Sequence, residues 1–519
     1  MSEPSPRSPA RSTPTGARHF DVPALFTLPA LDGADGRPGP TGVAATRTAT
    51  PAALRVVHLD TPDLRLTRAG VTLQHSSGRD TRARWTVSVP SIADPVIESH
   101  AGAQSQVPAA VLDLLTPWLR GAEITAVATL RAERRAHALL AVDGETVCEV
   151  FDDTVSVLDG RRVMARSREL VLMPVDDVDE PELINAIVAR LADAGATPKD
   201  GAQDALLRAL GPRASAPDDI PAAGRIRSTE PAAAVVAHAL RTGAARLRAA
   251  DSAVRRDLPD GVHQMRVACR RMRSDLKTFA SLVDHTWAER IRVELSWLAG
   301  SLGAARDLEV QRERLADVAA SDPLAPLDAG DVARLDAMLA SREDVARKHV
   351  AKVLRSKRYV ALVDLLVESA AWPHTTPAAD ASAASVLPPL VLAAWEKLVR
   401  AVGKLDDHDP DDDWHRARIL AKRARYAAEA VAPALGARAA TTAKAAAGVQ
   451  EVLGEHQDAA TAATLVLEIA AAHAHEGDFC VTLGRLAERE RAAVRHSRDR
   501  MPGVWAATRP SKVVAWARP

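Results

Sequence analysis

The stretch HQMRVACRRMRSDLK, residues His263 to Lys277, decides how the rest of the chain is interpreted. On an α-helix, at roughly 100° per residue, its basic side chains fall within an arc of about 80°. Its apolar side chains centre roughly 130° away, the pattern of an amphipathic helix with a core-facing stripe. One face should pack and the other should carry charge. The basic face holds His263, Arg266, Arg270, Arg273 and Lys277, and the apolar face Met265, Ala268, Met272, Leu276 and Phe279.

A second stretch, HRARILAKRARYAAE, repeats this arrangement from His415 to Glu429. Glu429 stands where the first copy has Lys277. A solvated face has no reason to repeat its cations at one spacing, whereas a groove that lines a linear polyanion from two sides does. The second basic face holds His415, Arg418, Lys422 and Arg425, and the second apolar face Ala417, Leu420, Ala424, Ala428 and Val431.

A shorter motif repeats at almost the same distance. LGxxRD begins at Leu302 and LGxxQD at Leu453, 151 residues apart, and the two histidines that open the basic faces are 152 apart. Two separated motifs with one offset indicate two copies of a multi-helix unit. We predict two bundles of about four helices each, related by a pseudo-twofold. The acids that end the motif, Asp307 and Asp458, either orient the arginines by ion pairing or are plain cap or surface residues.

Composition restricts the class of protein. The chain has 519 residues, 47% apolar and 26% charged, which is typical of a soluble globular protein with two to four domains. Lys plus Arg and Asp plus Glu both number 67, so any attraction for polyanions depends on how the charges are arranged. Three scattered cysteines suggest neither a disulfide framework nor a metal site and favour a reducing cytoplasm. We expect no membrane span and no secretory signal.

Changes in pattern along the chain predict an α+β multidomain protein. Residues 1–17 are rich in Ser, Pro and Arg and should form a disordered tail. Short alternating runs in 18–205 predict a β-rich domain that ends in a helix. Residues 206–228 have a linker composition, and 229–519 are helical in pattern, with halves at about 229–369 and 390–500.

The HxxRVxxRRxR segment from His263, its HxxRIxxKRxRY partner from His415 and the two LGxx(R/Q)D motifs resemble the CHAD domain, a duplicated helical domain. The resemblance covers roughly residues 229–500. It implies binding of inorganic polyphosphate through the basic helix faces, and association with polyphosphate granules stays open. Arg forks can grip phosphate oxygens bidentately, Lys supplies a mobile charge, and a histidine near phosphate should gain a proton. Binding should therefore weaken with salt and above the histidine pKa. Further basic residues that could extend the site are Arg241, Arg248, Lys352, Arg358 and Lys397.

The first half resembles the CYTH domain, the antiparallel β-barrel of triphosphate-tunnel enzymes, most closely in LDTPDLRLTRAGVTL, residues 59–73. The family's first strand carries ExExK, whose acids bind metal and whose lysine binds triphosphate. Aligned on Phe20, these positions hold Thr15, Ala17 and His19 here. The resemblance therefore implies a degenerate tunnel. Its remnants could be Glu98, Arg131, Arg134, Arg135, Asp152, Asp153 and Glu169.

Tunnel hydrolysis needs carboxylates for a divalent ion and a ring of cations for the developing charge. Because the first strand lacks both, we expect no enzyme activity, no catalytic residues, no metal site and no cofactor. The remaining acids are more typical of rim or turn residues. A metal-dependent triphosphatase-type hydrolase is the alternative. A nucleic-acid backbone binder is the other, but only 3% of residues are aromatic and the net charge is zero, which argues against it. The sequence identifies no protein partner.

Overall fold

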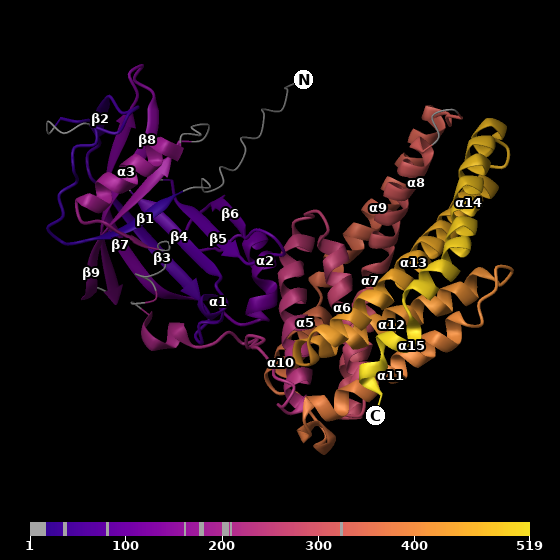
Figure 1. The fold of residues 1–519 in the computed structure, drawn as a ribbon. Coiled ribbons are helices and arrows are strands. Elements are labelled where there is room, and N and C mark those ends of the chain that lie inside the picture. The colour runs from indigo at the N-terminus through magenta and orange to yellow at the C-terminus, as the bar shows by residue number, and fades with distance from the viewer. Residues whose placement is uncertain are drawn as a thin grey trace. The chain divides into compact units, whose positions relative to one another are not determined.

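The computed structural model describes residues 17–34, 39–78, 82–159, 162–175, 181–199, 207, 210–321 and 325–518. The predicted tail lies almost wholly outside these ranges. The chain divides into two compact units, Met1–Asp219 and Ile220–Pro519. The first contains the strands and the second is helical (Figure 1).

The described strands of the first unit form one antiparallel sheet in the order β10-β1-β9-β8-β7-β3-β4-β5-β6, with β2 paired to β7. Alternating side chains along each strand give the sheet two faces, so residues directly opposite each other across a ladder share a face. The strands are β1 Arg18–Val22, β2 Ala45–Thr48, β3 Ala52–Asp60, β4 Thr72–Gly78, β5 Arg84–Val89, β6 Val96–Ala101, β7 Thr125–Leu140, β8 Thr146–Asp159, β9 Arg162–Pro174 and β10 Thr197–Lys199.

Helices cover this sheet through apolar contacts. Phe20 of β1 and Leu170 of β9 are buried with Leu183 and Ile187 of α3, Pro181–Asp193. A separate core brings the strands β4 and β5 against the helices α1, Arg65–Arg68, and α2, Ala109–Leu119. The sheet therefore has one apolar face under α3, and the opposite face of the same strands carries polar residues.

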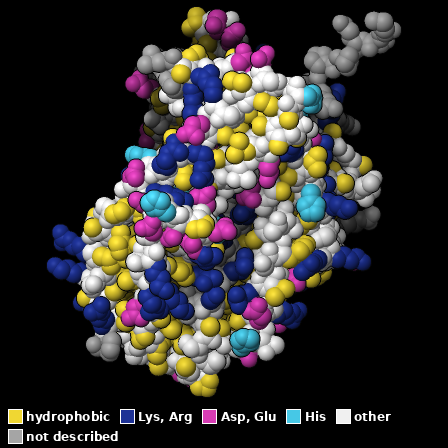
Figure 2. Space-filling model, turned by 90° about the vertical axis from the view of Figure 1, so that its right-hand side faces the viewer, with side chains coloured by type: hydrophobic (Ala, Val, Ile, Leu, Met, Phe, Trp, Pro, Cys, Tyr) yellow, Lys and Arg dark blue, Asp and Glu magenta, His cyan; other side chains and the backbone are white. Residues whose placement is uncertain are grey.

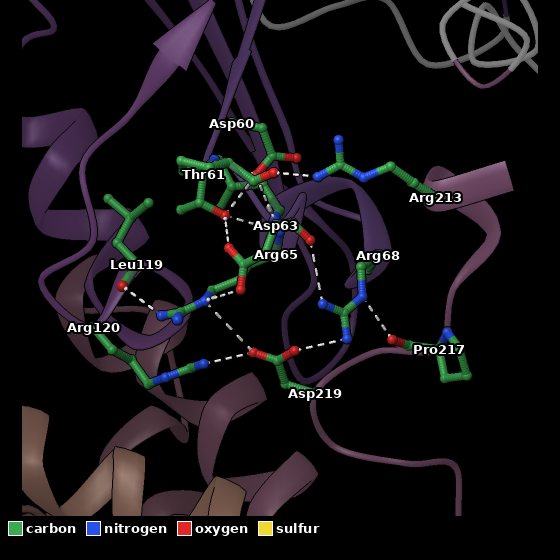
Figure 3. Close-up of polar contacts among 12 residues, drawn as sticks. Asp60, Thr61, Asp63, Arg65, Arg68, Leu119, Arg120, Arg213, Pro217 and Asp219 are labelled. Atoms are coloured by element: carbon green, nitrogen blue, oxygen red, sulfur yellow. Dashed lines mark hydrogen bonds and ion pairs between the residues drawn. The ribbon is translucent and has the colours of Figure 1, made fainter. Parts of the chain in front are cut away.

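The end of the first unit is fixed by charge (Figure 3). Asp219 accepts from Arg68 at 2.8 Å and from Arg120 at 2.5 Å, and Arg65 lies 3.9 Å from it. Arg213, in the short helix η1 (Gly211–Ser215), donates to the carbonyl of Pro62 at 2.6 Å. The stretch 211–219, which falls within the predicted linker, is therefore attached to the turn around α1. We call Asp219 and the three arginines at its carboxylate the Asp219 clasp.

The second unit consists of helices that repeat along the chain. Both α7 and α13 begin at equivalent positions, 285 and 437, and α8 and α13 end at equivalent positions, 320 and 472, each pair 152 apart. One long helix in the second copy thus corresponds to two helices in the first. The helices are α5 Ala232–Arg255, α6 Gly261–Thr278, α7 His285–Ser301, α8 Gly303–Ala320, α9 Ala329–Leu354, α10 Lys357–Ala371, η2 Pro377–Asp380, α11 Ala383–Val402, α12 Asp411–Leu435, α13 Ala437–Ala472, α14 Gly477–Ala507, α15 Pro510–Val513 and η3 Ala515–Ala517.

The two copies share a hydrophobic core. Met265 and Met272 of α6 are buried in the same cluster as Ala428 and Val431 of α12. The predicted fold class, an antiparallel β unit followed by a duplicated helical unit, is confirmed. No helix within the described ranges is long and apolar enough to cross a membrane.

Candidate functional site

The two basic helices pack against each other. Arg270 of α6 donates from Nε to Oη of Tyr426 on α12 at 2.8 Å. All five predicted apolar residues of α6 are buried, and so are four of the five on α12, Leu420 being half-buried while Ala421 takes the inner position. The basic side chains of both helices are mostly half-buried, unlike the exposed Arg416 on another side of α12. The stripe geometry predicted from the sequence is therefore present. We call the nine predicted residues of the two stripes the basic face.

The LGxxRD motif accepts hydrogen bonds from an arginine of the first stripe. Arg266 Nη1 donates to the carbonyl of Gly303 at 2.9 Å and to Oδ1 of Asp307 at 2.8 Å. Both acceptors lie in the first turns of α8. The ion-pairing interpretation of this acid is confirmed, and the motif fixes the direction of a stripe arginine.

The second copy repeats this contact. Arg418 Nη2 lies 3.1 Å from Oδ1 of Asp458, and Gly454 lies beside its guanidinium. His415 Nδ1 is 2.6 Å from Oε1 of Gln457. In the first copy the residue equivalent to Gln457 is Arg306, whose charge, after burial, lowers the pKa of His263. Each basic helix is therefore oriented by its own copy of the motif.

Lys422 lies where the two stripes meet. Burial, and then the charges of Arg418, Arg270 and Arg266, lower its pKa to about 7, against a smaller opposing effect of Asp458. Those arginines come from both helices. Within the described chain, Lys422 has no hydrogen-bond or ion-pair partner. Cations from two distant segments are thus crowded together without enough acids to neutralise them.

A second group of cations surrounds Lys277. The charge of Arg423, followed by burial and the charges of Arg292 and Lys397, lowers the pKa of this lysine. Lys277 and Lys397 have no ion-pair partner within the described ranges, and the same is true of Arg273, whose buried Nε lacks an acceptor. The positive region therefore extends from α6 toward α11.

Glu429 neutralises part of the second stripe. It accepts from Arg425 at 2.7 Å and lies 2.9 Å from Arg271. Arg271, which is not one of the basic-face residues, is thus paired with an acid. Arg425, by contrast, is partly neutralised, which makes it a weaker contributor than its helical phase predicted.

Three of the predicted extensions of the basic face are buried or contact other parts of the protein. Arg248 is only 9% exposed, because it lies on the packed side of α5. Arg241 donates to the carbonyl of Ala370, and Arg358 pairs with Glu294 at 2.8 Å while covering the ring of Trp297. Lys352 is exposed on α9. The part of these residues in binding stays a prediction, although one-helix periodicity could not reveal the protein contacts of Arg241 and Arg358 or the burial of Arg248.

Sequence reasoning missed several residues that shape the site. Tyr426, the tyrosine that ends the HxxRIxxKRxRY motif, was not among the predicted site residues, although it orients Arg270. Arg306 and Gln457 occupy the variable positions of the LGxx(R/Q)D motif, and their equal spacing from the two histidines was the available signal. Arg292 acts through its charge on Lys277 of another helix and left no signal in the sequence.

Charge on the molecular surface is mixed. Figure 2 shows one face on which Lys and Arg side chains gather around a hollow, with Asp and Glu side chains close to them. Because acidic and basic residues are equal in number, any attraction for a polyanion depends on such local gathering of cations.

The polar face of the N-terminal sheet carries a row of charges that are paired with one another. Arg134, Asp153, Glu169 and Asp21 lie opposite each other in turn across β7, β8, β9 and β1. Arg134 pairs with Asp153 at 2.6 Å, and Lys199 pairs with Glu169 at 2.5 Å and with Asp21 at 3.0 Å. We call these five residues the inner row.

The expectation that the remaining acids are rim or turn residues was wrong for three of them. Asp152, Asp153 and Glu169 are buried within strands, and Asp152 pairs with Arg168 at 2.6 Å. Glu98 lies in β6 beside His100, and Arg131 and Arg135 are exposed. Thr15, one of the three diagnostic positions, falls outside the described residues. No cluster of three or more His, Cys, Asp or Glu suited to a metal ion occurs in the described ranges.

The second unit belongs to a class of protein domain that consists of a duplicated helical bundle. In it, two equivalent helices present cations side by side. Residues 238–467 match the family model of the CHAD domain. This part of the chain is a CHAD domain, as its paired motifs predicted.

Similar proteins extend over different parts of the chain. An uncharacterized protein of Mycobacterium tuberculosis is 29% identical over 517 residues, covering 94% of this chain and 96% of its own. PptA from Streptomyces chartreusis is 27% identical and covers 53% of this chain and 100% of its own, with a TM-score of 0.46. The CHAD domain from the plant Ricinus communis is 26% identical and covers 57% and 93%, with a TM-score of 0.40. The N-terminal sheet resembles solved structures of putative adenylate cyclases at 12–15% identity and TM-scores of 0.22–0.23.

Proposed function

We propose that the CHAD domain binds inorganic polyphosphate along the basic face of α6 and α12 and catalyses no reaction on it. The observation that carries the proposal is Lys422, which is surrounded by arginines of both helices and has no acidic partner among the described residues. Crowded like charges are costly in a partly buried setting. An anion placed between them would relieve that cost.

The chemistry of the basic face fits a chain of phosphates. Arg266 and Arg418 are held by acids and carbonyls on one side, so their remaining N–H groups are oriented without being mobile. Lys277, Arg273 and Lys397 add cations that lack ion pairs within the described residues. CHAD domains are associated with polyphosphate. A protein that binds in this way would be recruited to polyphosphate granules.

A nucleic-acid backbone would be attracted by the same charges but would find few partners for its bases. Tyr426 is buried and its hydroxyl is already used by Arg270. Stacking platforms of exposed aromatic rings are what single-stranded nucleic acids require. We therefore expect polyphosphate to compete effectively against single-stranded RNA and DNA of equal charge.

We assign no reaction to the N-terminal unit. The inner row holds two cations, Arg134 and Lys199, and both are paired with carboxylates. A triphosphate entering there would have to displace those acids. The test is hydrolysis of tripolyphosphate with Mg²⁺ or Mn²⁺, for which we expect no turnover. Turnover that disappears on changing Glu98 or Glu169 would overturn this assignment.

The test of binding is a titration of the full chain with polyphosphates of graded length. A variant with His263, Arg266, Arg270 and Arg273 changed to glutamine should lose at least tenfold in affinity. It should also show a salt dependence reduced by about 0.7 per lost phosphate contact. Arg416→Gln, on another side of α12 and paired with Asp413, is the matched control. Equal affinity of the two variants for polyphosphate would show that the basic face does not bind it.

A further inference from the structure

The cations around Lys277 come from four different helices. Lys277 ends the first stripe on α6, and the cation that lowers its pKa most is Arg423 of α12. Burial comes next, followed by the charges of Arg292 on α7 and Lys397 on α11, while Glu289 has a smaller opposing effect. We call Lys277, Arg292, Lys397 and Arg423 the Lys277 group.

Most of the Lys277 group has no acid to neutralise it. Lys277, Lys397 and Arg423 are exposed and make no hydrogen bond or ion pair with any other described residue. Arg292, the fourth member, pairs with Glu289 on its own helix. Like charges that gather in one place repel one another and attract an anion. The group is therefore a candidate anion site.

The Lys277 group lies on the same stripe as the cations that surround Lys422, but at the other end. After burial, the charges that lower the pKa of Lys422 come from Arg418, Arg270 and Arg266, and we call these four residues the Lys422 group. Eleven residues of α6 separate Arg266 from Lys277, a rise of about 16 Å along the helix axis. Arg273 lies between the two ends, and its buried Nε has no acceptor among the described residues.

The corresponding end of the second stripe is closed by an acid. Glu429 stands where the first copy has Lys277, and it accepts from Arg425 and pairs with Arg271. A phosphate chain that leaves the Lys422 group would therefore meet a carboxylate along α12. Along α6 it would meet cations instead. The two copies of the repeat thus differ in charge, and only the first stripe continues the positive surface.

We propose that the Lys277 group is a second phosphate subsite, which one polyphosphate chain fills together with the Lys422 group, so that the protein selects long chains over short ones. This inference rests on the proposed function, because the ligand is the same. Tripolyphosphate is too short to span the rise of about 16 Å and occupies one group at a time. A longer chain reaches both groups, and its second contact is intramolecular and so adds affinity.

The first test measures how two double variants of the full chain bind tripolyphosphate and polyphosphates of increasing length. Lys397→Gln/Arg423→Gln removes two exposed cations of the Lys277 group. Lys348→Gln/Arg416→Gln is the control of equal charge, because each of its cations pairs with an acid on its own helix. The ratio of the affinity for long chains to that for tripolyphosphate should fall at least tenfold in the first variant and less than twofold in the control.

The comparison between variants separates the subsite from other effects of length. A long chain also binds better because more of its phosphates can occupy one group, but this advantage is the same in both variants. Equal ratios in the two variants, with long chains still bound, would overturn the second subsite and leave the proposed function standing. An unmodified protein that binds no polyphosphate of any length would refute both.

The second test asks whether the two residues contact phosphate directly. For long chains, the slope of log affinity against log salt concentration should be smaller in Lys397→Gln/Arg423→Gln than in the control, by about 0.7 for each lost phosphate contact. Circular dichroism of both variants verifies that helical content is retained. An identical slope in the two variants would contradict the subsite, because the removed cations would then make no contact with the chain.

Discussion

Arg270 on α6 and Tyr426 on α12 are 156 residues apart in the chain, and their side chains meet in a hydrogen bond of 2.8 Å. The phenolic oxygen accepts from Nε, so Nη1 and Nη2 of Arg270 stay without partners among the described residues. This contact joins the two copies of the repeat at the centre of the basic face. Tyr426 also lines a small cavity between α5, α6 and α12.

We predict that Tyr426→Phe weakens polyphosphate binding about fivefold, because Arg270 loses the acceptor that orients it. Helical content should not change, since the ring remains. A double-mutant cycle measures the coupling: in an Arg270→Gln background, Tyr426→Phe should have no further effect. A full loss in that background would show that Tyr426 acts independently of Arg270.

The pH dependence of binding should follow Lys422. Its pKa is about 7 in the free protein, mainly because of burial and then because of its arginine neighbours, and bound phosphates would raise it. Affinity is therefore highest below about pH 7 and falls as pH rises toward the pKa of the bound state. The pKa of His263 in the free protein is lowered by burial and then by the charges of Arg306 and Arg270, so this group loses its proton at lower pH than Lys422 does. The pH range over which affinity falls is therefore expected to be higher than the range predicted from the histidines alone.

Titrations at fixed ionic strength across this range measure the effect. Lys422→Met should bind more weakly near pH 7 and vary little with pH above it. Lys348→Met, which removes an exposed lysine of α9, is the control and should behave like the unmodified protein. If the pH dependence survives in Lys422→Met, another group carries it.

The same lysine should lower the stability of the free protein. Its folded-state pKa lies below that of an unfolded chain, so the protonated form is disfavoured by folding. This penalty is full at pH below about 7 and disappears as pH rises to the ordinary lysine value. Lys422→Met should raise the free energy of unfolding at pH 6 by on the order of 2 kcal/mol, and by less at pH 9. Urea denaturation with unchanged slope provides the measurement, and equal gains at both pH values would refute the electrostatic cause.

The helix pattern of the repeat predicted which side chains would lie inward, because that depends on local periodicity and burial. Met265 and Met272 are buried as expected, and the shared offset of the motifs corresponds to equivalent helices. The same pattern could not identify which cations had acids nearby. Arg358 is paired with Glu294, 64 residues away on another helix, and Arg248 is buried on α5.

In the N-terminal unit, too, the sequence did not show which charged residues would pair with one another. The absence of family residues at Ala17 and His19 could be seen in the sequence, but the replacement chemistry could not. Lys199 enters the row from β10, a strand of three residues, and pairs with Asp21 and Glu169. Only the strand order places these residues side by side.

The Asp219 clasp gives a prediction about the segment that leaves the first unit. Arg120 is 5% exposed at its side chain and contacts Asp219 at 2.5 Å, so removal of the carboxylate leaves a buried guanidinium with one fewer acidic partner. Losing one member of a buried ion pair is strongly destabilising, whereas an exposed pair contributes little. We therefore expect Asp219→Ala to release residues 211–219 from the turn around α1, while the sheet itself stays folded.

Trypsin cleavage after Arg213 should accelerate at least tenfold, measured by mass spectrometry of the fragments. Asp94→Ala, at an exposed position between β5 and β6, provides the control and should be cleaved at the unmodified rate. If cleavage after Arg213 is equally slow in both variants, the hydrogen bond from Arg213 to the Pro62 carbonyl holds this segment without the clasp.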